Sequence, residues 1–262
     1  LFQQQKLLSL RLQNVQKLSA LYQKRLSTGD ANILETNKIE LELYNIKTQM
    51  RLIETERNNK LKELQTLNGN LPIGEELTDY SPVDFPENFE IYSQEAIAAD
   101  PELRSLENEL KVARKNISLS KSLWFPKFEI GYIREMEPTD KYNGISFGIS
   151  IPLFENRNKI KQAKALSGYT QMQIENTRLQ SLSTLRQLYD QATNLKVSMQ
   201  EYNKLLQSQK TLSLLNKALE NGQLSMIEYF IEANQVYESM QNYLQLENQY
   251  QQIVSQMYRY KL

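Results

Sequence analysis

The chain contains no cysteine and no histidine among its 262 residues. Without cysteine it has no disulfide framework, no thiolate nucleophile and no thiolate metal ligand. Without histidine it lacks the commonest general base and the commonest metal ligand. We therefore expect a protein that is not an enzyme and that uses no cofactor and no bound metal.

Glycine and proline are scarce, with 8 and 7 residues, whereas Leu, Gln, Asn, Glu and Lys are abundant. This composition favours long helices over a compact mixed core. Basic and acidic residues balance at 31 each, so no net field draws the chain to nucleic acid or to anionic lipid. No run of about eighteen apolar residues is present that would form a transmembrane helix.

One stretch, residues 124–154, has the alternating pattern of β-strands. Its apolar positions are Phe128, Ile130, Tyr132, Ile145, Phe147, Ile149 and Ile151, and small or polar residues stand between them. Alternation with period two gives each strand one apolar face and one small or polar face. Arms of about nine or ten residues match a tilted transmembrane strand. Two interpretations are open: a barrel hairpin with lipid outside and water inside, or a soluble hairpin with one face on a core.

Apolar residues at helical spacing predict long helices on both sides of this hairpin. The expected parts are residues 1–68 as a first helical hairpin, 69–93 as an irregular connector, 94–123 as a helix, 124–154 as the β-hairpin, and 155–262 as a second helical hairpin. Asp100 and Pro101 mark a helix start. An unbroken helix from about residue 156 to 219 would span about 95 Å. Residues 1–20 already have a mid-helix pattern, so we expect a segment that begins inside a structural element.

An internal repeat relates the two helical hairpins. Gly29 and Gly222 each interrupt a helical pattern, and they are 222 − 29 = 193 positions apart. The same offset pairs Glu35 with Glu228 and Tyr44 with Tyr237. Both halves have the order helix, glycine turn, long helix, which indicates duplication.

These motifs resemble the TolC-like outer-membrane efflux proteins. The resemblance is carried by Asp100-Pro101-Glu102-Leu103, by Trp124-Phe125-Pro126-Lys127-Phe128, by residues 144–154 ending in Pro-Leu-Phe, and by the turns at 27–30 and 221–225. It implies a mainly α fold in which very long coiled-coil-like helices form an α-helical tunnel and one β-hairpin enters a membrane barrel. The family's protomers contribute two hairpins each, and residues 1–262 contain one, so we expect a fragment that lacks the first.

The resemblance also implies a function. It points to a passive homotrimeric duct in the outer membrane with a periplasmic tunnel, served by a periplasmic adaptor and an inner-membrane pump. The rivals are a soluble coiled-coil scaffold and a periplasmic adaptor. The alternating hairpin counts against the scaffold, and the lack of compact β-rich domains counts against the adaptor.

The candidate site residues fall into three groups. The membrane hairpin comprises Trp124, Phe128, Ile130, Tyr132, Ile145, Phe147, Ile149, Ile151 and Phe154. The aromatic residues near its ends would form interfacial girdles, or they pack in an ordinary way. The exposed helix turns, which the resemblance assigns to adaptor docking, comprise Ser27, Thr28, Gly29, Asp30, Asn221, Gly222 and Gln223. Glu35 and Glu228 either cap their helices or, as the resemblance implies, form an acidic ring at a gate.

Overall fold

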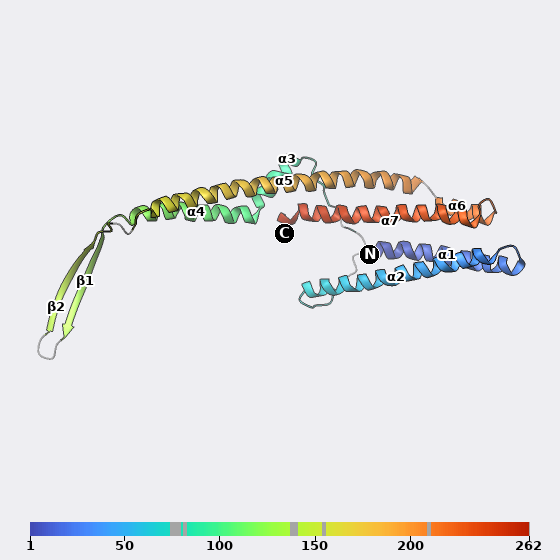
Figure 1. Ribbon diagram of the computed structural model, residues 1–262, viewed down its shortest axis with the longest axis horizontal. Helices are drawn as coiled ribbons and strands as arrows, with labels where there is room; N and C mark the ends of the chain where they lie inside the picture. Colours follow the sequence, from blue (N-terminus) through green and yellow to red (C-terminus); the bar gives the residue numbers. More distant parts are fainter. Residues whose placement is uncertain (74–79, 81–82, 137–140, 154–155, 209–210, 262) are drawn as a thin grey trace. The chain divides into compact units, whose positions relative to one another are not determined.

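The computed structural model describes residues 1–73, 80, 83–136, 141–153, 156–208 and 211–261. Its elements, drawn in Figure 1, are α1 (Phe2–Thr28), α2 (Ile33–Leu67), α3 (Phe89–Ala99), α4 (Pro101–Ser122), β1 (Lys127–Met136), β2 (Lys141–Ser150), α5 (Lys159–Ser208), α6 (Thr211–Glu220), α7 (Met226–Met257) and the 3-10 helix η1 (Arg259–Lys261). The mainly α fold with one β-hairpin is therefore confirmed. The chain divides into two compact units, one of Leu1–Phe85 with Asp190–Gln256 and one of Pro86–Tyr189 with Met257–Leu262.

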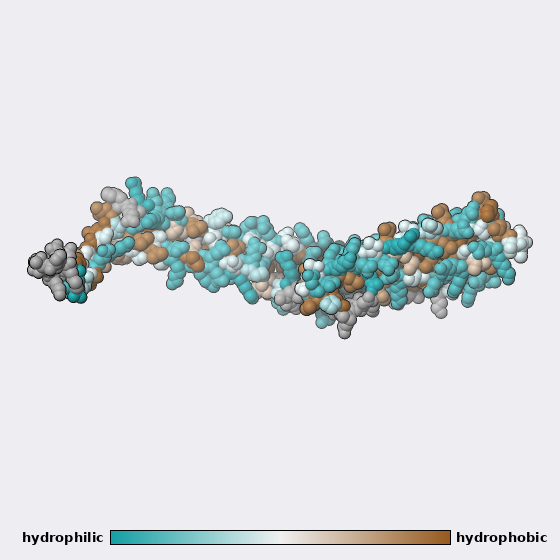
Figure 2. All heavy atoms as spheres, turned by 90° about the horizontal axis from the view of Figure 1, so that it is seen from below, coloured by the Kyte–Doolittle hydropathy of each residue, from teal (hydrophilic) through white to brown (hydrophobic). Residues whose placement is uncertain are grey.

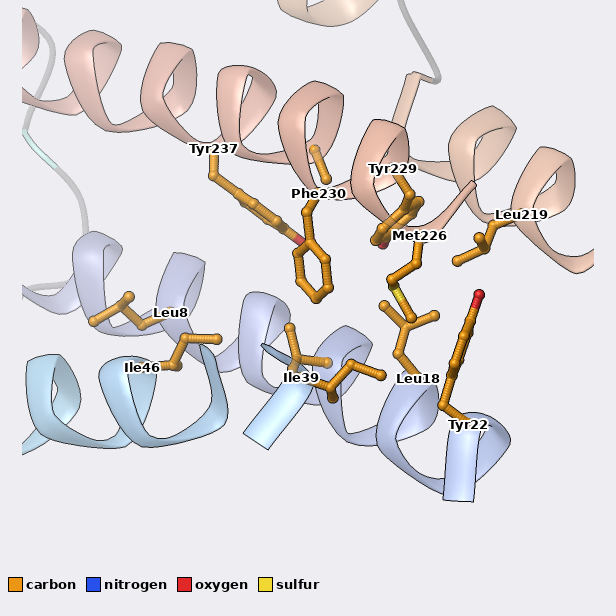
Figure 3. Packing of buried hydrophobic residues seen from close by; sticks show 12 residues of the cluster. Leu8, Leu18, Tyr22, Ile39, Ile46, Leu219, Met226, Tyr229, Phe230 and Tyr237 are labelled. Atoms are coloured by element: carbon orange, nitrogen blue, oxygen red, sulfur yellow. The ribbon is translucent and has the colours of Figure 1, made fainter. Parts of the chain in front are cut away.

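The first unit contains a hydrophobic core to which helices α1, α2, α6 and α7 all contribute. Its buried members are Leu8, Val15, Leu18, Tyr22, Ile39, Ile46, Leu219, Met226, Tyr229, Phe230, Ala233 and Tyr237. Figure 3 shows Phe230 and Tyr237 of α7 pointing toward α1 and α2. The expected three–four spacing of apolar residues places these side chains on one stripe of each helix. The two sequence repeats thus pack directly against each other.

A polar network borders this core and joins three helices. Arg11 of α1 forms an ion pair with Glu42 of α2 and donates a hydrogen bond to Asn234 Oδ1 of α7 at 2.9 Å. Its guanidinium carbon also lies 5.3 Å from the centre of the Tyr237 ring. Asn14 Nδ2 donates to Tyr237 Oη at 2.7 Å. The hydroxyl of a buried tyrosine needs such a partner, and burial raises the Tyr237 pKa above its ordinary value.

The second unit is built on α4, which packs against α5 through Leu103, Leu106 and Leu110 with Ile174. Asp100 caps α4, because its Oδ1 accepts a hydrogen bond from the Glu102 N–H at 2.9 Å. Its Oδ2 accepts a hydrogen bond from Ser181 Oγ of α5 at 3.2 Å. The start of α4 is therefore fixed both by its own cap and by its neighbour.

An aromatic cluster closes the other part of this unit. Tyr92 of α3 is buried and donates a hydrogen bond to the Met257 carbonyl at 2.8 Å. The rings of Tyr189, Tyr258 and Tyr260 lie between 6.1 and 6.5 Å from the Tyr92 ring, centre to centre. Burial raises the Tyr92 pKa above its ordinary value. The cluster joins α3 to the end of α7 and to η1.

Three boundaries differ from those expected from the sequence. Helix α3 begins inside the expected connector 69–93, because Asn88 Oδ1 accepts hydrogen bonds from the N–H groups of Glu90 and Ile91. The expected helix 94–123 is divided, because Asp100 ends α3 and caps α4. The expected helix 156–219 begins at Lys159 and is observed as α5 and α6, and residues 209–210 between them lie outside the described residues. In the described part of the chain, no helix is long and apolar enough to cross a bilayer.

The core of the first unit makes a stability prediction. Ile39 is 1% exposed at the centre of the cluster, so Ile39→Ala should lower the free energy of unfolding by about 2–5 kcal/mol through lost transfer energy and a residual cavity. Lys38→Ala, at the exposed neighbouring position, is the control and should change it by less than about 0.5 kcal/mol. Urea denaturation measures both. Equal, small effects would contradict the packing described.

Candidate functional site

The hairpin register places its apolar residues on one face. In the antiparallel ladder the facing apolar pairs are Phe128 with Ile149, Ile130 with Phe147, and Tyr132 with Ile145. The alternate pairs are Lys127 with Ser150, Glu129 with Gly148, and Gly131 with Ser146. Directly facing residues project to the same side of a sheet. Over Lys127–Tyr132 and Ile145–Ser150, one side of the ribbon is therefore apolar and the other is small or polar, and beyond these pairs Ile133 lies on the second side, opposite Gly144.

The apolar face is exposed. Phe128 is 72% exposed, and Ile130 and Phe147 are each 76% exposed. Figure 2 shows hydrophobic side chains at the surface at the hairpin end, on the left of the view. Burying apolar surface contributes roughly 25 cal/mol per Å², so a contiguous exposed apolar face marks an interaction surface. In the described residues, the apolar face of the hairpin does not pack on a core of the same chain, as a soluble hairpin would require.

On the opposite face of the hairpin, Gly131 of β1 and Ser146 of β2 lie close together. A Cβ atom at Gly131 would lie 2.7 Å from Ser146 Oγ, which is too close for any larger residue without movement. Ser146 Oγ donates a hydrogen bond to the Gly131 carbonyl at 3.3 Å. The glycine and serine positions therefore keep this face thin.

A buried amide joins the two ends of the hairpin. Asn156 is 5% exposed, and its Nδ2 donates a hydrogen bond to the Leu123 carbonyl. Trp124 and Phe125, which follow Leu123, are exposed. Phe154, assigned to the membrane hairpin from the sequence, lies outside the described residues.

The two glycine turns have the same backbone geometry. Gly29 has φ +83° and Gly222 has φ +71°, a region that glycine enters without steric cost. The Gly29 N–H donates to the Leu26 carbonyl at 3.2 Å, and the Gly222 N–H donates to the Leu219 carbonyl at 3.1 Å. The next N–H groups, of Asp30 and Gln223, donate to the carbonyls five residues back, each at 2.8 Å. Both turns are Schellman motifs.

Both turns lead into a capping box. At the first, the Glu35 N–H donates to Asn32 Oδ1 at 3.0 Å and the Asn32 N–H donates to Glu35 Oε2 at 2.9 Å. At the second, the Glu228 N–H donates to Ser225 Oγ at 3.3 Å and the Ser225 N–H donates to Glu228 Oε2 at 2.8 Å. Glu35 and Glu228 thus hold the starts of α2 and α7. A gating role for them stays a prediction.

The turns are accessible and lie together. All seven residues assigned to docking are exposed: Ser27, Thr28, Gly29, Asp30, Asn221, Gly222 and Gln223. The shared core brings the end of α1 and the start of α2 beside α6 and the start of α7, and Figure 1 shows both turns at one end of this unit.

The sequence did not reveal the Arg11 network or the Asn156 contact. A polar residue in a helical or loop pattern carries no local sign of a distant partner.

Comparison with known proteins gives the family. Residues 92–260 match the sequence profile of the outer membrane efflux protein family. The chain belongs to this family, which consists of outer-membrane efflux proteins and not of enzymes. This places the chain in the outer membrane. A search of curated proteins found no match.

Solved structures show the same fold at low sequence identity. CusC has a TM-score of 0.84 at 18% identity, over 99% of this chain and 64% of CusC. The outer membrane protein VceC from Vibrio cholerae has a TM-score of 0.81 at 12% identity, over 98% of this chain and 64% of VceC. The CmeC outer membrane channel of Campylobacter jejuni has a TM-score of 0.72 at 13% identity, over 98% of this chain and 58% of CmeC. The chain therefore spans less than two thirds of the length of these structures.

The second capping box makes a pH prediction. Hydrogen bonds from the Ser225 N–H and hydroxyl hold the Glu228 pKa below its ordinary value of 4.5. A carboxyl whose pKa is lowered by folding stabilises the fold above its unfolded pKa, and this contribution is lost as the pH falls through the folded pKa. A carboxyl ¹³C NMR titration should give a Glu228 pKa below 4.5, and Ser225→Ala should raise it part of the way back. A pKa at or above the ordinary value would contradict the capping box.

Proposed function

We propose that this chain is part of a passive outer-membrane channel that works as a homotrimer in a tripartite efflux system. An inner-membrane pump drives the substrates, and a periplasmic adaptor connects the pump to the channel. The observation that carries this proposal is the exposed apolar face of a hairpin joined to long helices, in a chain of the outer membrane efflux protein family.

The hairpin has the dimensions that a membrane strand needs. Each strand has 10 residues, and a tilted strand needs about 9–11 residues to cross the hydrocarbon. Its apolar face would contact lipid, and its face of glycine, serine and charged residues would line a water-filled lumen. In lipid every backbone N–H and C=O needs a partner, so the outer edges of β1 and β2 must each pair with a further strand. Copies of the protein in a trimer supply such strands.

The two turns are the proposed docking points for the adaptor. They present short backbone loops and small polar side chains at the end of the first unit, and their tight hydrogen bonding fixes the shape of both tips. Glu35 and Glu228, beside the tips, would in addition form a ring of acids if the copies surround a common axis. The capping boxes are compatible with this second role, because each carboxylate uses one oxygen in the cap.

A charge placed on the apolar face tests the membrane assignment. Phe147→Lys should destabilise membrane insertion by about 2–4 kcal/mol near the bilayer midplane, and it should lower the amount of protein extracted from the outer-membrane fraction. Glu129→Lys places the same side chain on the opposite face and should insert normally. Quantitative immunoblots of membrane fractions measure both variants. Normal insertion of Phe147→Lys would contradict lipid contact at this face.

The docking role makes a separate prediction for Gly222. A Cβ atom there meets nothing within 4 Å, so the expected strain in Gly222→Val comes from the left-handed backbone, which costs about 1–2 kcal/mol for a residue with Cβ. We expect Gly222→Val to impair export and to leave trimerisation intact. Gly222→Asn, which tolerates this backbone region, should keep export.

Growth inhibition by a panel of dyes, detergents and divalent metal salts measures export in cells that lack their own channel. Native gels measure the trimer. Unchanged resistance with Gly222→Val would remove the special role of this turn, and a lost trimer would show that the turn acts through assembly instead.

A further inference from the structure

A cavity of about 320 Å³ lies between α3, the loop that precedes it and the segment around η1, all within the second unit. Ligand pockets usually have volumes of about 300–1,000 Å³, so this cavity, which we call the α3–η1 pocket, has room for a small organic molecule. It shares no residue with the hairpin or with the glycine turns. Its lining residues include Glu87, Asn88, Tyr92, Glu95, Tyr258 and Tyr260.

Helix α3 and its cap supply one wall of the α3–η1 pocket. Asn88, Tyr92 and Glu95 are spaced four and three positions apart, so their side chains lie on one side of the helix. Asn88 Oδ1 already accepts the hydrogen bonds of the cap, from the N–H groups of Glu90 and Ile91. This wall therefore offers a ligand mainly the Tyr92 ring and the Glu95 carboxylate.

Three tyrosine rings pack together at the pocket. The Tyr258 and Tyr260 rings each lie 6.1 Å from the Tyr92 ring and 6.3 Å from each other, centre to centre. Tyr92 is 3% exposed, and its hydroxyl donates a hydrogen bond to the Met257 carbonyl. Tyr258 and Tyr260 are half-buried. The buried ring thus holds in place two rings whose surfaces are accessible to a ligand.

The charges that line the pocket are negative. They are the side chains of Glu87 and Glu95, which are both exposed. Among the described residues neither carboxylate belongs to an ion pair. The charge of Glu95 reaches the rings, because burial and, after it, this charge raise the Tyr260 pKa above its ordinary value. Arg259 stands between the two tyrosines in the sequence but does not line the pocket.

We propose that the α3–η1 pocket binds an organic cation that carries a quaternary ammonium group. A cation is attracted to the face of a tyrosine ring, and Tyr92, Tyr258 and Tyr260 supply such rings. The carboxylates of Glu87 and Glu95 balance the charge of the ligand. A quaternary ammonium group has no N–H to satisfy, so it suits a pocket whose walls are ring surfaces.

A metal ion matches the pocket less well. Hard cations such as Ca²⁺ take about six or more oxygen ligands, whereas the acids that line this pocket are Glu87 and Glu95. In the part of the chain that the structure describes, no group of three or more acidic, histidine or cysteine side chains is arranged to hold a metal ion. The aromatic rings therefore decide the class of ligand.

The experiment uses the full-length protein that contains this chain, labelled with 3-fluorotyrosine and studied by ¹⁹F NMR. Tyr258→Phe and Tyr260→Phe assign the signals of the two accessible rings. Benzyltrimethylammonium chloride should shift both signals in a saturable titration. N,N-dimethylbenzamide, a neutral molecule of similar size, should bind about fivefold more weakly or less, because it lacks the attraction between a cation and the rings.

Two pairs of variants separate the charge from the rings. Glu95→Gln removes a carboxylate and should weaken binding of the ammonium ion by about two- to fivefold, as for an exposed ion pair. Glu90→Gln, the matched control, removes an exposed acid from the same helix outside the pocket lining and should leave binding unchanged. Tyr260→Leu should weaken binding by about threefold or more, whereas Tyr260→Phe keeps the ring and should bind within about twofold of the unchanged protein.

Equal affinities for the ammonium ion and the neutral molecule would overturn the inference, as would equal effects of Glu95→Gln and Glu90→Gln. Shifts of the Tyr258 and Tyr260 signals by polylysine alone would also overturn it, in favour of a basic protein partner. The proposed channel does not depend on this pocket. A protein that exports normally in the growth assay but shows no ammonium binding therefore overturns this inference alone.

Discussion

The packing of α7 into the groove between α1 and α2 is the contact on which the helical unit depends. It joins two sequence repeats that would otherwise be separate helical hairpins, each with one bare apolar stripe. A polar network fixes the register of this contact, because a half-buried ion pair and a buried hydroxyl each tolerate few alternative partners. The network consists of Arg11, Glu42, Asn234 and Tyr237. The glycine turns complete the unit by bringing each helix back along its neighbour.

Apolar side chains stay exposed on several elements of the described residues, and two of these surfaces bear on the proposed function. One is the outward face of the β-hairpin, and the other is the outward stripe of α2 around Leu41 and Tyr44. A soluble monomer gains nothing from such surfaces, since exposed apolar area opposes solubility. Lipid would cover the first surface and a second copy would cover the second. The same principle, burial of apolar area by a partner outside the chain, thus accounts for both the membrane location and the assembly that we propose.

Much of this fold follows from the sequence. Alternation over residues 128–132 and 145–151 is a local signal, so it predicted which residues share a face, and the strand register agrees. Glycine after a helical run and an acid three residues after a cap are also local, so both turns and both capping boxes were visible. The offset of 193 was visible because the turns repeat at equal spacing.

Other features depend on distant partners and were not predictable. Asn88 looks like a polar loop residue until the helix that it caps is known, so the start of α3 was placed in the connector. Arg11 and Asn156 act through residues remote in sequence, Asn234 for the first and Leu123 for the second.

Lipid contact along the return strand tests the central claim most directly. Single cysteines at positions 145–150 can carry a small fluorophore in the full-length protein, reconstituted in bilayers that contain brominated lipid. The register predicts strong quenching at 145, 147 and 149 and weak quenching at 146, 148 and 150, because neighbouring strand residues point to opposite faces. Uniform quenching, or quenching by a water-soluble agent at 145, 147 and 149, would contradict a lipid-facing hairpin.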